Sequence, residues 1–389
     1  METNEFTLQL PAHAVFGAGV RAGIGEQIRR LRASSALLVT DDFLLASGPA
    51  EDFRRAIESA GLRCEVFSGV QPDPTDRNVA AGLEALRGAE ADLVVAFGGG
   101  SVLDAAKMIA IMAVNPGPIR EYRGYHRIPT GGVPLIAVPT TAGTGSEATR
   151  VAVITDTEHD EKLMILDGHL VPTVAVVDFE LSATMPPPLT AHVGIDTLTH
   201  GIEAYVSRLA NPLTDALALT CVKLVGENLE RAWADPDDRD ARAGMALAAY
   251  AGGAAFANAS VALVHGMSRP IGALFHVPHG LSNAVLLPTV VGFSLTGAAA
   301  RYAELARILG FAGDSDDDAL AGERMAAGLA ELNERLEVPP LGSLEQVERS
   351  RFDSSVEKMA ADALASGSPE RNPVVPTAEQ IVDLYKEAW

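Results

Sequence analysis

Four residues of the chain have the types and spacing to bind one metal ion: Asp196, His200, His265 and His279. Asp196 and His200 are four residues apart in GIDTLTH, so on a helix their side chains share one face, one turn apart. The two later histidines stand in VHG and PHG, and we expect the proline-containing stretch between them to loop back. Any one of these histidines alone would more often be an ordinary core or surface residue. One carboxylate and three imidazoles together suit a divalent transition metal, iron or zinc, with room for a substrate oxygen.

A glycine-rich segment earlier in the chain has the character of a phosphate-binding turn. The apolar run VVAF leads directly into Gly98, Gly99, Gly100 and Ser101, and SVLDAAK then begins a helix with Ser101 and Asp104 at the spacing of a capping box. Glycines allow the backbone to approach a pyrophosphate, and a helix N-terminus supplies free N–H groups and a positive dipole. A plain strand-to-helix turn explains the three glycines equally well.

Two other segments favour a dinucleotide. Asp41 ends the apolar run ALLVTD, where an acid can accept hydrogen bonds from an adenosine ribose and repel a 2′-phosphate, although an exposed turn aspartate is the simpler alternative. The stretch 134–149, PLIAVPTTAGTGSEAT, is an apolar strand that opens into Thr, Gly and Ser, which would line a polar ligand. By contrast, GAGVRAG at 17–23 lacks the G-x-G-x-x-G spacing, so we interpret it as a turn.

Strands and helices alternate in the first half of the chain, whereas the second half has only helical patterns. We expect a strand at 5–16, or a short pair of strands interrupted at Pro11, and further strands at 36–41, 64–69, 91–97 and 134–139 and three within 151–178. We expect helices at 25–31, 49–60, 75–88 and 101–113. After the prolines of LSATMPPPLT we expect helices at 190–207, 212–233, 240–263, 297–309, 319–337, 354–365 and 377–388. These patterns predict an α/β nucleotide-binding domain (1–184), with a parallel sheet covered by helices on both faces, and an all-helical domain (185–389) that holds all four metal ligands. A cleft between the domains is the expected active site.

The composition is that of a globular protein and excludes some partners. Of 389 residues, 48% are hydrophobic and 21% are charged, and the formal net charge is −21. Nucleic acids and anionic membrane surfaces are poor partners for such a chain, because both require a basic patch. Cys64 and Cys221 are far apart, which fits a reducing cytoplasm and argues against a disulfide framework. We expect no secretion signal at the N-terminus, and we interpret the charge-poor stretch 245–267 as a buried helix rather than a bilayer span.

Taken together, the motifs resemble those of the iron-containing (group III) alcohol dehydrogenases, and of lactaldehyde reductases among them. The stretches that carry the resemblance extend over nearly the whole chain: GGGSVLDAAK, IAVPTTAGTGSEAT, GIDTLTHGIEAYVS, VHGMSRPIGALFHVPHGLSNAVLLP and NPVVPTAEQIVDLY. The resemblance implies hydride transfer between NAD(P) and a small alcohol or aldehyde, with Fe(II) or in some members Zn(II) at the four metal ligands. It also implies a homodimer with the N-terminal strand at the contact. The cofactor-binding residues that it implies are Asp41, Asp73, Gly98, Gly99, Gly100, Ser101, Asp104, Thr140, Thr141, Thr144 and Lys162, of which Asp41 favours NAD over NADP.

One position departs from the family pattern. Many members have a histidine four residues after the third metal ligand, and here Arg269 takes that place. Arginine does not shuttle protons at neutral pH, but its guanidinium can hold a carboxylate or phosphonate. We therefore expect a substrate with an anionic group, such as a hydroxy acid or a semialdehyde, unless Arg269 pairs with a nearby acidic residue instead. His276 either takes over part of the missing histidine's role or simply packs.

Three other functions stay open at this point. A relative of glycerol dehydrogenase or dehydroquinate synthase would assemble its metal site differently, and the spacing of Asp196 and His200 argues against that branch. A metallohydrolase could use the same four ligands to activate water, but it would have no use for Asp41 or the glycines at 98–100. A non-catalytic nucleotide-binding module would leave the four ligands unexplained. We therefore predict a cytoplasmic, dimeric, NAD- and metal-dependent alcohol or aldehyde oxidoreductase.

Overall fold

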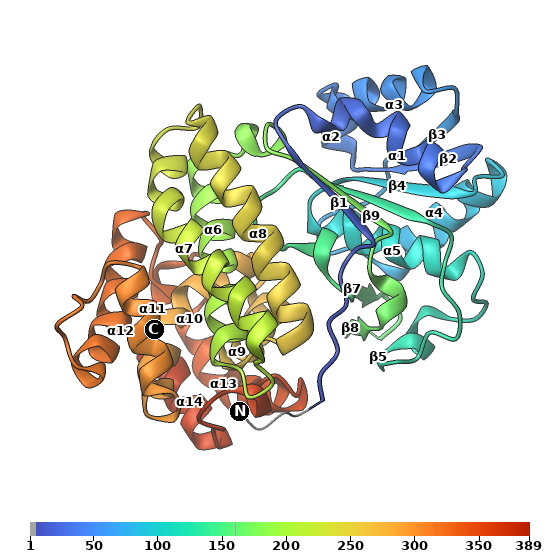
Figure 1. Cartoon of the computed structure of the whole chain (residues 1–389). Helices are drawn as coiled ribbons and strands as arrows, with labels where there is room; N and C mark the ends of the chain where they lie inside the picture. Colours follow the sequence, from blue (N-terminus) through green and yellow to red (C-terminus); the bar gives the residue numbers. More distant parts are fainter. Residues whose placement is uncertain (1–4, 160) are drawn as a thin grey trace. The chain divides into compact units, whose positions relative to one another are not determined.

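The computed structural model describes residues 5–159 and 161–389, which form two compact units (Figure 1). One unit is α/β and comprises Gln9–Ala183, and the other is helical and comprises Thr184–Trp389 together with residues 5–8. This confirms the predicted fold class. The expectation of an N-terminus without a secretion signal rests partly on residues 1–4, which lie outside the described residues.

A six-stranded parallel sheet forms the centre of the α/β unit, in the order β1-β9-β6-β4-β2-β3. Its strands are β1 (His13–Gly17), β2 (Ser35–Val39), β3 (Arg63–Phe67), β4 (Leu93–Gly98), β6 (Leu135–Pro139) and β9 (Val174–Asp178). Every residue of β2, β4, β6 and β9 is buried, as expected for strands that are covered on both faces. The covering helices are α1 (Ile24–Leu31), α2 (Asp42–Ala46), α3 (Pro49–Ser59), α4 (Asp76–Gly88) and α5 (Gly100–Met112).

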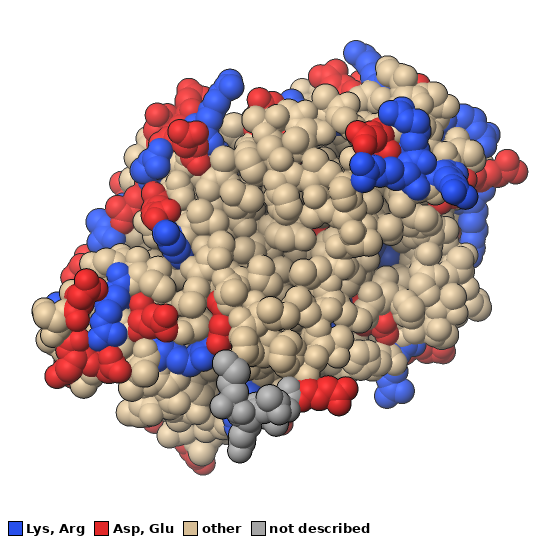
Figure 2. All heavy atoms as spheres, viewed as in Figure 1, with Lys and Arg blue, Asp and Glu red and all other residues tan. Residues whose placement is uncertain are grey.

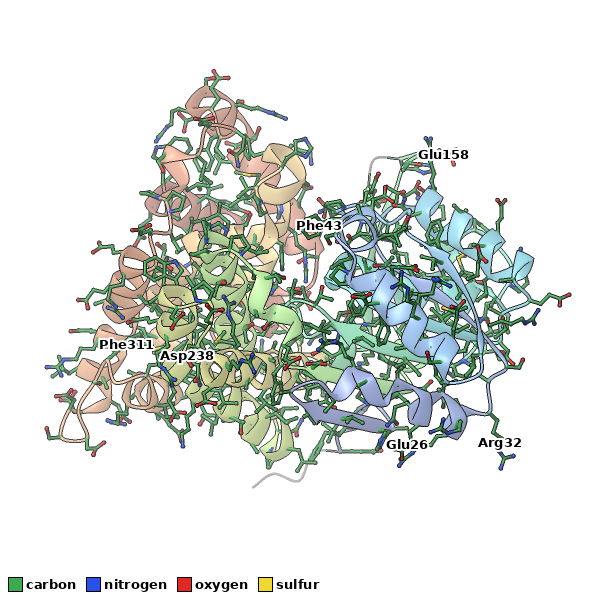
Figure 3. All side chains as sticks on the ribbon, turned by 90° about the horizontal axis from the view of Figure 1, so that it is seen from above. Glu26, Arg32, Phe43, Glu158, Asp238 and Phe311 are labelled. Atoms are coloured by element: carbon green, nitrogen blue, oxygen red, sulfur yellow. The ribbon has the colours of Figure 1, made fainter. Side chains whose placement is uncertain are left out.

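Each face of the sheet has its own apolar core. Helices α4 and α5 pack on one face, and α1 and α3 pack on the other. Helix α1 illustrates how the helices cover the sheet, because Ile24 and Ile28 are buried while Glu26 is exposed. Figure 3 shows Glu26 and Arg32 pointing outward at the two ends of this helix. The apolar residues of α1 therefore lie on the one face of the helix that packs on the sheet.

The strand order reverses between β2 and β4. From β2 the chain continues to β3 on one side, whereas β4 pairs with β2 on the other side and is followed outward by β6 and β9. In open parallel sheets, ligands bind at the carboxyl ends of the strands on either side of such a reversal. Asp41 follows β2, and Gly98 ends β4. The topology therefore places both predicted nucleotide-binding segments at the expected ligand site of the sheet.

Three of the predicted strand regions differ in detail. The run at 5–16 forms a strand only from His13, because Pro11 interrupts the extended segment. The segments at 151–156 and 161–166 do not join the main sheet: β7 (Val151–Asp156) and β8 (Glu161–Leu166) pair antiparallel and, with β5 (Gly124–Tyr125), form a separate three-stranded sheet. Burial alternates along β7, so only one of its faces is covered.

The glycines at 17–23 form a turn and a 3₁₀ helix (Val20–Gly23), as interpreted from the sequence. Gly19 has a φ of 70°, a conformation that suits glycine. The Asp178 carboxylate accepts hydrogen bonds from the backbone N–H groups of Gly19 and Arg21 and from the Arg21 guanidinium. The donors of this turn therefore bind a carboxylate of the protein itself.

Nine α-helices build the helical unit within the described residues. They are α6 (Pro187–Val206), α7 (Pro212–Ala234), α8 (Arg239–Ala259), α9 (Leu263–Phe275), α10 (His279–Ser294), α11 (Ala299–Ile308), α12 (Asp318–Arg335), α13 (Arg349–Ala365) and α14 (Ala378–Glu387). Several begin at caps that are visible in the sequence, such as Asn211 before α7 and Thr377 before α14, each with a capping box. Small residues bring α6, α7 and α8 close together: a Cβ on Gly201 would lie 2.9 Å from Val222, and one on Gly252 would lie 2.9 Å from Cys221.

Two predictions for this unit were wrong. The expected helix at 240–263 ends at Ala259, where the chain bends by 103° into α9, with Ser260 at a φ of 70°. The stretch between His265 and His279 was expected to loop back and no helix was predicted there, but most of it is the helix α9, with Pro270 inside it, and α10 was likewise not predicted. A proline inside a helix removes one backbone donor and its ring crowds the carbonyl four residues earlier, but α9 continues through Pro270 to Phe275.

The apolar helices of this unit are core helices. By length and composition alone, the 19 residues from His279 to Gly297 are sufficient for a membrane span, but half of that window is buried within the protein. Core helices commonly meet this criterion, so it is weak evidence for a membrane span. On the face shown in Figure 2, acidic and basic side chains occur together, in agreement with the spread of acidic residues along the sequence.

Candidate metal and nucleotide sites

The four predicted metal ligands come together in the helical unit. Asp196 and His200 lie one turn apart on α6, His265 is in the first turn of α9, and His279 is the first residue of α10. Asp196 Oδ1 is 3.8 Å from His200 Nε2, 3.6 Å from His265 Nε2 and 3.7 Å from His279 Nε2. Around a tetrahedral ion with bonds of about 2.1 Å, the ligand atoms lie about 3.4 Å apart. The ligand atoms of Asp196, His265 and His279 all lie within 4.8 Å of one another, so these three residues could hold one divalent ion, whereas His200 is near Asp196 but lies outside this group of three.

Three of the four side chains in this cluster are buried, so their charges interact strongly. The side chains of Asp196, His200 and His265 are at most 5% exposed, whereas that of His279 is 47% exposed. Burial alone would raise the pKa of Asp196, but the nearby imidazoles outweigh burial and lower it far below its usual range. The carboxylate therefore stays ionised, and the exposed side of His279 leaves the cluster open on one side.

Glu203, which the sequence interpretation missed, holds His265 in place. Its buried carboxylate accepts a hydrogen bond from His265 Nδ1 at 2.6 Å, and it also accepts bonds from the backbone N–H groups of Ala262 at 2.9 Å and Val264 at 2.6 Å. The same side chain thus caps the N-terminus of α9 and directs Nε2 of His265 toward Asp196. Burial would lower the pKa of His265, but Glu203 and Asp196 raise it overall. A carboxylate behind a metal-binding histidine typically fixes its tautomer and raises its basicity.

Asn283 was also missed and contacts Asp196 directly. Its Nδ2 donates a hydrogen bond to Asp196 Oδ1 at 2.6 Å, and the same nitrogen lies 3.2 Å from His265 Nε2 and 3.3 Å from His279 Nε2. Asn283 Oδ1 is buried and has no hydrogen-bond partner among the described residues.

Helical spacing was the signal that could have identified both residues. Glu203 is three residues after His200, and Asn283 is four residues after His279, so each shares a helix face with a predicted ligand. Polar residues on the buried face of an otherwise apolar helix need partners. This reasoning could have identified Glu203 and Asn283 as residues of the cluster, but it could not have predicted which atoms they contact.

In the α/β unit, the glycine segment (98–101) and the threonine segment (140–144) lie side by side. Gly98 pairs with Pro139 in the register of β4 and β6, and the Thr140 N–H donates to the Gly98 carbonyl at 3.0 Å. A Cβ on Gly99 would lie 3.5 Å from Thr141 Cγ2. A Cβ on Gly100 would lie only 2.7 Å from Thr144 Cγ2. Glycines at these positions therefore keep open a backbone-lined cradle that side chains would fill.

The predicted capping box at the start of α5 was wrong. The helix begins at Gly100 with Gly99 as its N-cap, so Ser101 lies inside the first turn and no side chain caps the helix. Asp104 instead accepts hydrogen bonds from Ser146 Oγ at 2.7 Å and from the Val153 N–H at 2.9 Å. Because no side chain caps it, the first turn of α5 offers backbone N–H groups of the kind that bind phosphate.

The remaining predicted cofactor residues lie near the carboxyl ends of the strands or on β8. Asp41 is the N-cap of α2, where its Oδ1 accepts a hydrogen bond from the Leu44 N–H at 2.8 Å. Asp73 adopts a left-handed conformation with a φ of 55°, and Lys162 of β8 pairs with it at 2.7 Å. Both side chains of this ion pair are partly exposed, so the pair is accessible to a ligand.

Arg269 and His276, the two predicted catalytic residues, lie on and directly after α9. Arg269 Nη1 donates to Ser368 Oγ at 2.8 Å. His276 closes the C-terminus of α9 in a left-handed conformation with a φ of 56°, and its N–H donates to the Gly272 carbonyl at 3.0 Å. The helix end thus fixes the backbone of His276, and its side chain is exposed.

The family of the chain follows from comparison with known proteins, and it agrees with the two-unit fold and the two candidate sites. The family model for iron-containing alcohol dehydrogenase matches residues 11–179, and that for the C-terminal part of the same family matches residues 190–389. The chain belongs to the iron-containing alcohol dehydrogenase family, which confirms the predicted family.

Individual relatives cover the full length. The chain is 37% identical to an NAD-dependent methanol dehydrogenase from Bacillus methanolicus over 97% of this chain and 98% of the relative. It is 36% identical to the lactaldehyde reductase of Escherichia coli over 97% of both. Among solved structures, a 1,3-propanediol oxidoreductase superposes with a TM-score of 0.96 at 34% identity, covering 99% of this chain and 100% of that one. A sulfoacetaldehyde reductase from Bifidobacterium kashiwanohense, solved with NAD+, gives a TM-score of 0.88 at 28% identity, covering 99% of both.

Proposed function

We propose that the protein transfers hydride between NAD(H) and a small alcohol or aldehyde, with a divalent ion held by Asp196, His200, His265 and His279. Membership of the iron-containing alcohol dehydrogenase family supports this function. The single observation that carries the metal assignment is the convergence of three imidazoles within 3.8 Å of one buried carboxylate oxygen. Iron is the first candidate and zinc the second, because both accept this donor set. The ion supplies Lewis-acid polarisation of the substrate oxygen.

The residues of the α/β unit bind and orient the nucleotide in this proposal. The first turn of α5 and the hydroxyls of Thr140, Thr141 and Thr144 hold the pyrophosphate, and Asp41 accepts a ribose hydroxyl. A negative charge at Asp41 disfavours a 2′-phosphate, so NAD is the expected cofactor rather than NADP. The partly exposed pair of Asp73 and Lys162 contributes further polar contacts.

Arg269 is proposed to bind an anionic group of the substrate. Its hydrogen bond to Ser368 orients the guanidinium, and a planar guanidinium binds carboxylates and sulfonates through paired hydrogen bonds. A structural relative is named as a reductase of sulfoacetaldehyde, an aldehyde that carries a sulfonate. His276, with its exposed side chain, is the proposed group for proton exchange with solvent.

We also propose a cytoplasmic homodimer. β1 is an edge strand of the main sheet and pairs with β9 on its inner side. An edge strand offers backbone donors and acceptors to a second copy. Phe16 of β1 is 38% exposed, which adds apolar surface at this edge.

Titration of NADH fluorescence with and without a chelator tests the function. The proposed enzyme binds NADH in both conditions and loses alcohol oxidation when the metal is removed, because the nucleotide cradle and the metal cluster belong to different units. A metallohydrolase would not bind NADH, and a nucleotide-binding module would show no metal-dependent turnover.

Replacement of Arg269 by methionine tests the substrate class. We expect the KM for acid-bearing aldehydes to rise at least about tenfold, which corresponds to loss of one paired charge interaction, while the KM for neutral aldehydes changes little. Arg335→Met, which removes a half-exposed guanidinium that pairs with Glu230, serves as the control. Equal effects of Arg269→Met on acidic and neutral substrates would reject an anion-binding role.

A further inference from the structure

Lys107, in the middle of α5, is buried and donates three hydrogen bonds to one segment of the α/β unit. Its side chain is 0% exposed, and Nζ lies 2.8 Å from Ser146 Oγ, 2.9 Å from Thr149 Oγ1 and 2.8 Å from the Val151 carbonyl oxygen. An ammonium group has three N–H donors, so these contacts use all of them. All three acceptors follow the threonine segment within seven residues of Thr144.

Asp104, one turn before Lys107, holds the same segment from a second direction. Its Oδ1 accepts the hydrogen bond of the Ser146 hydroxyl and lies 4.0 Å from Lys107 Nζ, and its Oδ2 accepts that of the Val153 N–H. The Ser146 hydroxyl therefore accepts from Lys107 and donates to Asp104. Glu147 is also buried here, at 2% exposure. The Asp104 side chain is 18% exposed, but Lys107 is fully buried, so breaking its contacts would leave a buried charge without partners, which is costly.

The segment held in this way, residues 140–146, forms the side of the proposed nucleotide cradle opposite the first turn of α5; we call it the threonine wall. At its start, the Thr140 N–H is bonded to Gly98, and at its end Ser146 is bonded to Lys107 and Asp104. Between these anchors lie two glycines, Gly143 and Gly145, the second with a φ of 59°. Glycines leave a backbone many alternative conformations, so the position of Thr144 over Gly100 depends on the anchors.

We propose that Lys107 is a positioning residue for nucleotide binding: through Ser146, Thr149 and Asp104 it fixes the threonine wall at the distance from the α5 N-terminus that a pyrophosphate requires. Lys107 itself does not touch the nucleotide, because all of its N–H donors are bound to the protein. This inference rests on the proposed function, since the cradle at Gly98–Ser101 is part of that proposal.

The test uses three variants, each of which removes different contacts between Lys107 and the segment that follows Thr144: Ser146→Ala, Thr149→Val and Lys107→Met. The first two keep the buried charge and remove one hydroxyl each, and they are mild enough to leave the fold intact if Lys107→Met does not fold. We expect the Kd for NADH to rise at least about tenfold in each, because each variant removes at least one hydrogen bond to a charged group. Amide hydrogen exchange in residues 145–151 should become faster, and kcat should change less than the KM for NAD. Thr220→Val and Lys223→Met, on the exposed side of α7, are the matched controls.

The outcomes separate the two proposals. Gly100→Ala adds a Cβ at 2.7 Å from Thr144 Cγ2, so it should block NADH binding if the cradle is the nucleotide site. If Gly100→Ala blocks binding but Ser146→Ala and Thr149→Val bind NADH like the wild type, the positioning role of Lys107 is rejected and the cradle stands. If only Lys107→Met weakens binding, the charge acts directly and the positioning role is likewise rejected. If Gly100→Ala binds NADH normally, both proposals fail.

Discussion

Replacing Glu203 by glutamine should weaken metal binding without unfolding the helical unit. Glutamine has nearly the same shape as glutamate, but one of its terminal atoms is an N–H donor. Glu203 receives one donor on Oε1, from Val264, and two on Oε2, from Ala262 and His265 Nδ1. The least costly orientation of glutamine keeps its oxygen in the place of Oε2. The amide nitrogen then faces the Val264 N–H, and that buried donor loses its partner.

The size of the effect follows from these contacts. One unsatisfied buried donor costs about 1–3 kcal/mol of the free energy of unfolding in the metal-free protein. Loss of the carboxylate behind a metal-binding histidine typically lowers metal affinity about 10–100-fold. That loss corresponds to about 1.4–2.8 kcal/mol of binding free energy. Both effects are smaller than expected for Glu203→Leu, which would leave all three donors buried without an acceptor.

Metal affinity is the appropriate assay because it does not require turnover. The metal-free wild type and Glu203→Gln are titrated with Co(II) in competition with a chelator, and the visible bands of bound Co(II) report the ligand set. Circular dichroism on heating measures the stability of each metal-free protein. Glu227→Gln, which neutralises an exposed glutamate on α7, is the matched control and should bind Co(II) like the wild type.

The reasoning would be refuted by a folded Glu203→Gln protein with wild-type Co(II) affinity and an unchanged spectrum. In that case the backbone alone would orient His265, and Glu203 would serve only to cap α9. A variant that lost stability but kept its affinity would lead to the same conclusion.

Three further predictions concern the α/β unit. Gly100→Ala should weaken NADH binding at least about tenfold in a fluorescence titration, because its Cβ would contact Thr144, whereas Gly88→Ala, with nothing within 4 Å of the added Cβ, should not. Burial raises the pKa of Glu147 from 4.5 to about 7, so between these pH values the folded state keeps a proton that the unfolded state has released, and stability falls as the pH rises. Chemical unfolding from pH 4.5 to 7 should therefore show wild-type stability falling relative to Glu147→Gln, by on the order of 3 kcal/mol; parallel pH profiles would contradict this. Asp41→Ser keeps an N-cap oxygen for α2 but removes the charge, so the ratio of kcat/KM for NADP to that for NAD should rise about tenfold, and an unchanged ratio would assign Asp41 to capping alone.

Local spacing made part of this structure predictable. Asp196 and His200 were recognisable because a helix places residues four apart on one face. The carboxyl ends of β2 and β4 were recognisable because buried parallel strands are continuous apolar runs that end in turn residues. These two local patterns were sufficient to predict where the glycine-lined turn begins and that Asp196 and His200 lie together on one helix.

Interactions between distant segments were beyond the reach of such patterns. Pro270 indicated a chain that loops back, but α9 continues through this proline to Phe275. Asp104 matched a capping box with Ser101, but its real partner, Ser146, is 42 residues away. Lys107 drew no functional interpretation, because its acceptors are 39–44 residues away and only the fold brings them together.

The charges around the metal cluster explain why two carboxylates are buried there. His265 and His279 lie in the first turns of α9 and α10, and each helix N-terminus carries a partial positive charge of about half an elementary charge. A divalent cation near these two termini is disfavoured unless negative charge is placed beside it. Asp196 and Glu203 contribute a formal charge of −2, equal in size to that of the ion. Glu203 accepts hydrogen bonds at the N-terminus of α9 and from His265. One side chain therefore offsets the partial positive charge of the helix N-terminus and polarises His265. We therefore expect the charge of Glu203, and not only its shape, to be required, which is why glutamine is the informative replacement.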